Sequence, residues 1–212
     1  MLDVHAPHEK VHGTKDFFVH LFTITIGLFI ALSLEGLVEW QHHRNLVHEA
    51  SAGLRSEIDQ NTVRIASLRQ QISGEQKELN QNLNALEVLR VHPEQHMQMS
   101  FTFRQQGFED TAWKTAQATG AFAYMPYQDA REYSNIYGTQ SEIYRVQQQV
   151  MDEAMSAASL INTKSDTYKP SADRIDMLSD RIGLIQLRLL LLNSAVDGLD
   201  KTYRDYRSSH IR

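Results

Sequence analysis

The residues best suited to chemistry are the histidines, seven of which lie within the first 48 residues. His5, His8 and His12 share one face if the N-terminal tail is helical, a spacing that suits a transition metal. Pro7 interrupts such a helix, however, and no aspartate or cysteine completes an obvious ligand set. His20, at the edge of an apolar segment, could ligate haem or a chlorophyll magnesium. The alternative, which we expect, is that all of these are interfacial polar groups.

No catalytic motif accompanies the histidines. The chain has no cysteine, which excludes disulfides, thiol catalysis and thiolate metal sites. It also lacks a Walker loop, a G-x-G-x-x-G run, an H-E-x-x-H zinc motif and a G-x-S-x-G nucleophile elbow. The net charge of −5 indicates no concentrated basic face for nucleic acid. We therefore expect no enzymatic activity, no cofactor and no nucleic-acid partner.

The segment "FFVHLFTITIGLFIALSLEGLVEW", residues 17–40, predicts a transmembrane helix. From Phe17 to Val38 it contains no Lys, Arg or Asp, and at about 1.5 Å per residue it spans about 33 Å, close to the thickness of a hydrocarbon core. No small-x-small cleavage site follows, so we expect an uncleaved signal anchor rather than a signal peptide or a buried helix. Lys10 and Lys15 in the tail (1–16) favour a single span in a bacterial inner membrane, with the body (41–212) in the periplasm.

Within this span, small residues and a carboxyl recur every four positions. Thr23, Gly27, Ala31 and Glu35 lie on one face of a helix because residues four apart are neighbours. Such stripes let transmembrane helices approach closely, and a carboxylate prefers a helix neighbour to lipid. We therefore predict a helix–helix contact through this face, by self-association or with another membrane subunit. The alternative is a lone span whose glutamate reaches the interface.

Beyond the span, a heptad pattern continues the helix to about residue 92, where Pro93 ends it. Its main row is Ile58, Ile65, Ile72, Leu79 and Leu86. Three polar residues, Asn61, Glu75 and Asn82, dilute the neighbouring apolar pattern. Residues 93–109 show no period and predict a connector. A short helix over 110–119 and a longer one over 126–163 follow, the latter with a tyrosine-rich apolar face that we interpret as core rather than a ligand surface.

The last predicted helix, residues 170–209, has the clearest heptad pattern. Two apolar rows recur every seven residues, as in coiled coils: Ile175, Ile182, Leu189, Val196, Tyr203, and Leu178, Ile185, Leu192, Leu199, Tyr206. The first four residues of each row are the expected core of the body. The run "LRLLLL" is too short and too closely flanked by charge to span a membrane.

The predicted fold class is therefore all-α: one N-terminal transmembrane helix followed by a long-helix antiparallel bundle, a coiled-coil-like domain. Between its helices, the segment "DTAWKTAQATGAFAYMP" gathers Trp113, Lys114, Tyr124 and Met125. Asp110 is a candidate N-cap for this segment and Gly120 a candidate C-terminal stop. We interpret the segment as a structural turn rather than a binding loop.

Two stretches resemble a known group of sequences. The span "LFTITIGLFIALSLEGLVEWQHHRNL" and the segment "DTAWKTAQATGAFAYMPYQDAREYSNIYGTQ" are similar to those of uncharacterised bacterial single-span membrane proteins that share an "ITIGLxIALxLEGLVEWxHHR"-like span and a helical C-terminal domain. The resemblance covers the span and the middle of the body. It implies a membrane-anchored helical domain and transfers no activity, cofactor or catalytic residue.

These observations favour an accessory or scaffolding subunit that associates with other membrane proteins, for example in a respiratory or photosynthetic complex. The alternative is a periplasmic small-ligand sensor or binding module, since helical bundles bind ligands between their helices. The tail over residues 1–16 is too short for a signalling domain. A sensor of this kind would therefore act through a partner.

Overall fold

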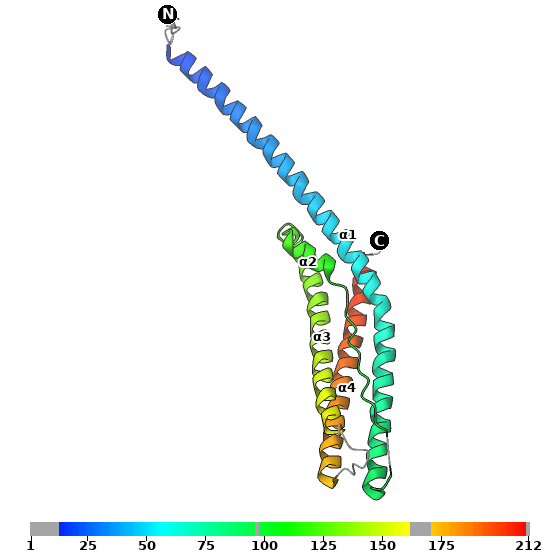
Figure 1. Ribbon diagram of the computed structural model, residues 1–212. Coiled ribbons are helices and arrows are strands. Elements are labelled where there is room, and N and C mark those ends of the chain that lie inside the picture. Colours follow the sequence, from blue (N-terminus) through cyan, green and yellow to red (C-terminus); the bar gives the residue numbers. More distant parts are fainter. Residues whose placement is uncertain (1–12, 96–97, 162–170, 211–212) are drawn as a thin grey trace, which may run out of the picture. The chain divides into compact units, whose positions relative to one another are not determined.

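The protein is all-α over the residues that the computed structural model describes, 13–95, 98–161 and 171–210 (Figure 1). These ranges contain four α-helices, one 3-10 turn and no strand. The helices are α1 (Gly13–Val91), α2 (Thr111–Ala118), α3 (Tyr127–Ile161) and α4 (Ala172–His210), and the 3-10 turn η1 (Ala121–Ala123) follows α2.

The chain forms two compact units, unit 1 (Met1–His48) and unit 2 (Glu49–Arg212). Helix α1 contributes to both, because it runs without interruption from Gly13 to Val91. Its first buried side chain is Leu54. The second unit begins at Glu49, eight residues beyond the expected start of the body at 41.

In unit 1, the apolar side chains of α1 are exposed. Phe22, Ile24 and Val38 are each more than 60% exposed, as are several of their neighbours. An 18-residue window of α1 has a mean hydropathy of 2.2 with none of it buried, which makes this helix long and apolar enough to cross a membrane. Hydroxyls within the apolar stretch bond to the helix backbone, since Thr23 and Ser33 donate to the carbonyls of Val19 and Phe29. An apolar helix whose hydroxyl groups bond to its own backbone suits lipid.

In unit 2, α3 packs along α4 and residue numbers fall on one helix as they rise on the other. A buried tyrosine pair, Tyr133 with Tyr206, joins the hydroxyls at 2.8 Å near one end. Towards the other end, Glu153 accepts from Arg181 at 2.9 Å. Burial raises the pKa of Tyr133, and the hydrogen bond to Tyr206 raises it further, so this phenol stays neutral.

Polar side chains also join α1 to α4, and the residue numbers on α4 fall as those on α1 rise. Going along α1, the pairs are Asp59 with Arg207, Arg69 with Asp197, Asn80 with Gln186, and Arg90 with Asp176. The even spacing of these pairs shows that the two helices keep one register over about 30 residues.

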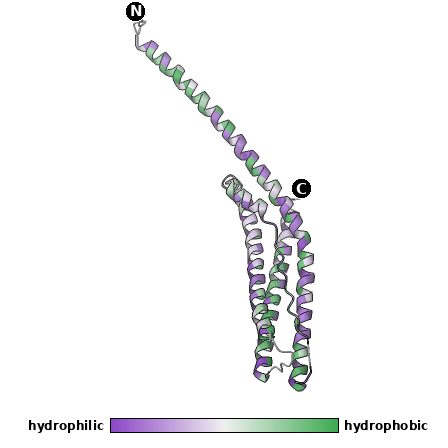
Figure 2. Ribbon diagram, in the orientation of Figure 1, coloured by the Kyte–Doolittle hydropathy of each residue, from purple (hydrophilic) through white to green (hydrophobic). Residues whose placement is uncertain are grey.

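The expected core residues of α4 are buried in unit 2, and Figure 2 shows hydrophobic residues recurring along this helix. They are Ile175, Leu178, Ile182, Ile185, Leu189, Leu192, Val196 and Leu199, each at most 3% exposed. The window of α4 with mean hydropathy 1.4 is also apolar enough to cross a membrane, but a third of it is buried within the protein. A helix that supplies the core of a folded unit passes the same test of length and composition.

Candidate functional site

The connector between α1 and α2 runs back along α1, held by a line of polar side chains. Going along α1, the contacts are Asn61 with Glu109, Arg64 with Gly107, Gln71 with Arg104, Glu75 with Arg104, Glu78 with Thr102 and Asn82 with Ser100. The connector has no helix or strand of its own between Gln98 and Asp110. Its bonded main-chain polar groups therefore take their partners from side chains of α1 and α3 rather than from a neighbouring strand.

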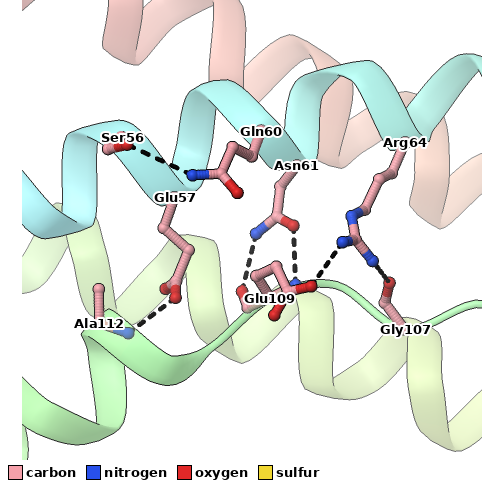
Figure 3. A network of polar contacts seen from close by, with 8 residues as sticks. All are labelled: Ser56, Glu57, Gln60, Asn61, Arg64, Gly107, Glu109 and Ala112. Carbon is pink, nitrogen blue, oxygen red and sulfur yellow. Dashed lines mark hydrogen bonds and ion pairs between the residues drawn. The ribbon is translucent and has the colours of Figure 1, made fainter.

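Three amide side chains each make two hydrogen bonds to one connector residue. Asn61 donates to the carbonyl of Glu109 and accepts from its N–H, both at 2.8 Å (Figure 3). Asn82 does the same to Ser100, and Gln147 of α3 does so to Gln106. A carboxamide carries a donor and an acceptor side by side, so it can replace the edge of a neighbouring strand. These amides fix the connector between α1 and α3.

The carboxylate of Glu57 lies at the point where α1, α2 and α3 meet. It accepts hydrogen bonds from the N–H groups of Ala112 at 2.7 Å and Trp113 at 3.4 Å, in the first turn of α2. It also accepts from the hydroxyl of Tyr137 at 2.6 Å. The candidate N-cap Asp110 makes no capping bond with its side chain. Glu57 therefore caps α2 from a helix more than 50 residues away, where negative charge is favoured by the helix dipole.

The side chain of Tyr137 is held in place by its neighbours. Burial raises its pKa well above the usual value, and the hydrogen bond to Glu57 raises it further, so the phenol remains a neutral donor. Trp113 stacks on its ring at a centroid distance of 4.8 Å and an interplanar angle of 11°. Phe122, from η1, packs against Trp113 at a centroid distance of 4.8 Å. The two rings are held by packing and by a hydrogen bond, which makes them rigid.

Gly120 allows the chain to turn from α2 into η1. Its φ of +73° lies in the left-handed region, which glycine adopts without a steric penalty. The N–H groups of Thr119 and Gly120 bond back to Thr115 and Gln117, which closes the end of α2. The turn places Phe122 against Trp113.

A cavity of about 530 Å³ lies between the end of the connector, α2 and α3. Its lining residues are Gly107, Phe108, Asp110, Trp113, Lys114, Gln117, Tyr137, Gln140, Ser141 and Tyr144. Aromatic and polar side chains contribute together, and the only formally charged lining residues are Asp110 and Lys114, which form an ion pair at 2.8 Å. The size falls within the range of small-molecule sites.

The predicted transmembrane stripe lies on α1 in unit 1. Thr23, Gly27, Ala31 and Glu35 are exposed, and a Cβ added at Gly27 would meet nothing within 4 Å. The stripe is thus separate from the cavity, which lies in unit 2.

Of the predicted histidine ligands, His5, His8 and His12 lie outside the described residues, and His20 is exposed on α1. Within the described ranges, no group of three or more His, Cys, Asp or Glu is arranged to hold a metal.

The residues that organise the cavity were not recognisable as a set from the sequence. Glu57, Tyr137 and Lys114 come from three helices, and of the lining residues only Trp113 and Lys114 are grouped from the sequence, together with Tyr124 and Met125. The polar residues that dilute the apolar heptads of α1 in the sequence, Asn61, Glu75 and Asn82, do not line the cavity, so they give no signal of it.

Comparisons with family models, with curated proteins and with solved structures find no match to this chain.

Proposed function

We propose that this protein is a membrane-anchored accessory or scaffolding subunit, with α1 crossing a bacterial inner membrane once and unit 2 forming an antiparallel helical bundle in the periplasm. The observation that carries the proposal is the contrast between the two apolar helices. No residue in the apolar window of α1 is buried, whereas α4 buries both of its heptad rows in unit 2. An exposed apolar helix of this length needs lipid or a partner, so α1 is the span and α4 is part of the body.

The contact with other membrane proteins, or with a second copy, is assigned to the face of Thr23, Gly27, Ala31 and Glu35. Open space around Gly27 allows the backbone of a second helix to approach closely. Glu35 on the same face would gain a hydrogen-bond partner there instead of facing acyl chains, where a carboxyl group costs several kcal/mol in the worst case.

A matched pair of glycine substitutions tests this contact. Gly27→Ile places a branched side chain on the stripe, whereas Gly36→Ile places the same side chain about 180° around the helix axis from Gly27. Both positions have open space in the chain itself, so neither substitution disturbs the fold. After extraction of the native membrane in mild detergent, we expect Gly27→Ile to lose co-migrating subunits and Gly36→Ile to retain them. A wild-type protein that runs alone as a monomer would contradict the proposal.

The second candidate function is a small-ligand sensor that acts through a partner, favoured by the cavity beside Trp113. The same carboxylate, Glu57 of α1, binds α2 at Trp113 and α3 at Tyr137, both of which line the cavity. A ligand that shifts α2 or the ring of Tyr137 would therefore act on a hydrogen bond to Glu57 of α1. The two candidate functions differ in one expected outcome. Only the sensor function predicts that a ligand bound to unit 2 changes the amount of partner that co-migrates with the protein.

A further inference from the structure

We propose that the cavity lined by Trp113, Tyr137 and Tyr144 binds a small zwitterion that carries a planar ring, of which a free aromatic amino acid is the simplest example. This inference deepens the second candidate function, because it names the ligand class of that site. It is independent of the transmembrane contact.

The rings of the cavity indicate a planar group in the ligand. Phe108 comes from the connector, Trp113 from α2, and Tyr137 and Tyr144 from α3. Tyr144 is 45% exposed, so one of its surfaces is available to a ligand. Offset stacking or edge contact with such rings favours an aromatic partner over an aliphatic one of equal size.

The charges of the cavity indicate a zwitterion. Lys114 and Asp110 are one turn apart on α2 and its N-cap, with side chains 69% and 45% exposed. An exposed ion pair of this kind contributes little to stability, so replacing it with contacts to a ligand costs little free energy. An ammonium group on the ligand would bond to Asp110 while a carboxylate of the same ligand bonds to Lys114. Each charge of the pair would then keep an opposite partner.

Ligands of a single charge fit less well. The N–H groups at the start of α2, which would otherwise attract a phosphate or sulfate, are already bonded to Glu57. A bare anion would also face Asp110, and a bare cation would face Lys114. The cavity walls are preorganised, because Tyr137 is held by Glu57 and stacked on Trp113 before any ligand enters.

The test uses the full-length protein in detergent with Trp40→Phe, which leaves Trp113 as the one tryptophan, since the chain has two. The probes are L-phenylalanine, 3-phenylpropionate, phenethylamine and L-leucine, which remove in turn the ammonium, the carboxylate and the ring. Binding is followed by Trp113 fluorescence and by titration calorimetry. We expect saturable binding of L-phenylalanine, with 3-phenylpropionate and phenethylamine each at least about tenfold weaker, as for the loss of a charged hydrogen bond. L-leucine, which keeps both charged groups, should also bind more weakly because it lacks the ring contacts.

Variants locate the binding. Lys114→Met and Asp110→Asn are each expected to weaken L-phenylalanine about tenfold, and Tyr144→Ala to weaken it as well. Lys201→Met, an exposed lysine on α4, is the matched control and should leave the affinity unchanged. Thermal unfolding followed by circular dichroism verifies that each variant is folded.

The inference is overturned if no probe binds. It is also overturned if 3-phenylpropionate or phenethylamine binds as tightly as L-phenylalanine, or if the Lys114 and Asp110 variants both bind normally. Binding of L-phenylalanine without any change in partner recovery would support the site and refute only the sensor function.

Discussion

Two helices that contribute to unit 2, α1 and α4, have heptad rows of the same period, but the rows differ in composition and in what they contact. In α4 all ten positions of the two rows are apolar and buried. In α1 the row that contains Ile58 is apolar, but the row three residues further on contains three leucines and three polar residues. That second row reads Leu54, Asn61, Leu68, Glu75, Asn82 and Leu89, and all six are buried.

The difference follows from what each row contacts. Apolar rows stabilise helix pairs by removing hydrocarbon from water. The polar positions of α1 face the connector, an extended segment whose main chain needs donors and acceptors. Asn61 and Asn82 are buried at almost no cost because each completes both hydrogen bonds of one connector residue. A polar residue in a heptad row can therefore mark a site where an extended segment replaces a helix.

The largest expected effect comes from the apolar row. Leu189→Ala removes a side chain that is 0% exposed in α4 and leaves a cavity in the core. We expect a loss of about 2–5 kcal/mol in the free energy of unfolding. The matched control is Leu190→Ala, one residue along, where the side chain is 60% exposed and the change should stay within about 0.5 kcal/mol. Denaturant unfolding of the full-length protein in detergent measures both. Equal losses would show that α4 is not the core helix.

The second effect comes from the polar row. Asn61→Leu restores the pattern of α4 but leaves the N–H and the carbonyl of Glu109 without their partner. We expect a loss of about 1–3 kcal/mol, as for an unsatisfied buried polar group, although leucine is the more apolar residue. Gln60→Leu is the control, since its amide bonds only to exposed Ser56.

Amide hydrogen exchange provides a second measurement of Asn61→Leu, because the connector around Glu109 should lose protection. An unchanged or increased stability would mean that the polar row does not hold the connector.

Periodicity in the sequence predicts the all-α fold because apolar residues at helical spacing form one face of a helix, which is stabilised by burial. The α4 rows illustrate this, since every residue expected in the core is buried. The extended path of the connector could not be predicted in the same way. Its partners, such as Asn61 and Glu109, are 48 residues apart, and no local pattern connects them.

The cavity was harder still to predict. Asp110 was expected to cap α2, but Glu57 of α1 provides the cap, so Asp110 remains available to pair with Lys114. The stack of Trp113 on Tyr137 likewise depends on how α2 is placed against α3. A sequence shows which residues could take part in such a site, and tertiary contacts determine which of them meet.

The smallest effect is a pH dependence that arises at Glu75, a carboxyl group in the polar row. Burial raises the pKa of Glu75, and the hydrogen bonds from Gln71 and from the N–H of Arg104 offset part of that rise. The folded protein therefore binds this proton more tightly than the unfolded chain does. Stability from Glu75 is fully present below its unfolded pKa and is lost as the pH rises through the folded pKa.

Glu75→Gln removes this titration while keeping an oxygen that accepts both hydrogen bonds. We expect the variant to gain stability relative to the wild type as the pH rises from about 4 to about 7, with the unfolding free energy measured at each pH. A difference that stays constant with pH would refute the assignment. A difference that grows would show that the polar row carries a cost near neutral pH, which the apolar rows of α4, having no titratable carboxyl group, do not.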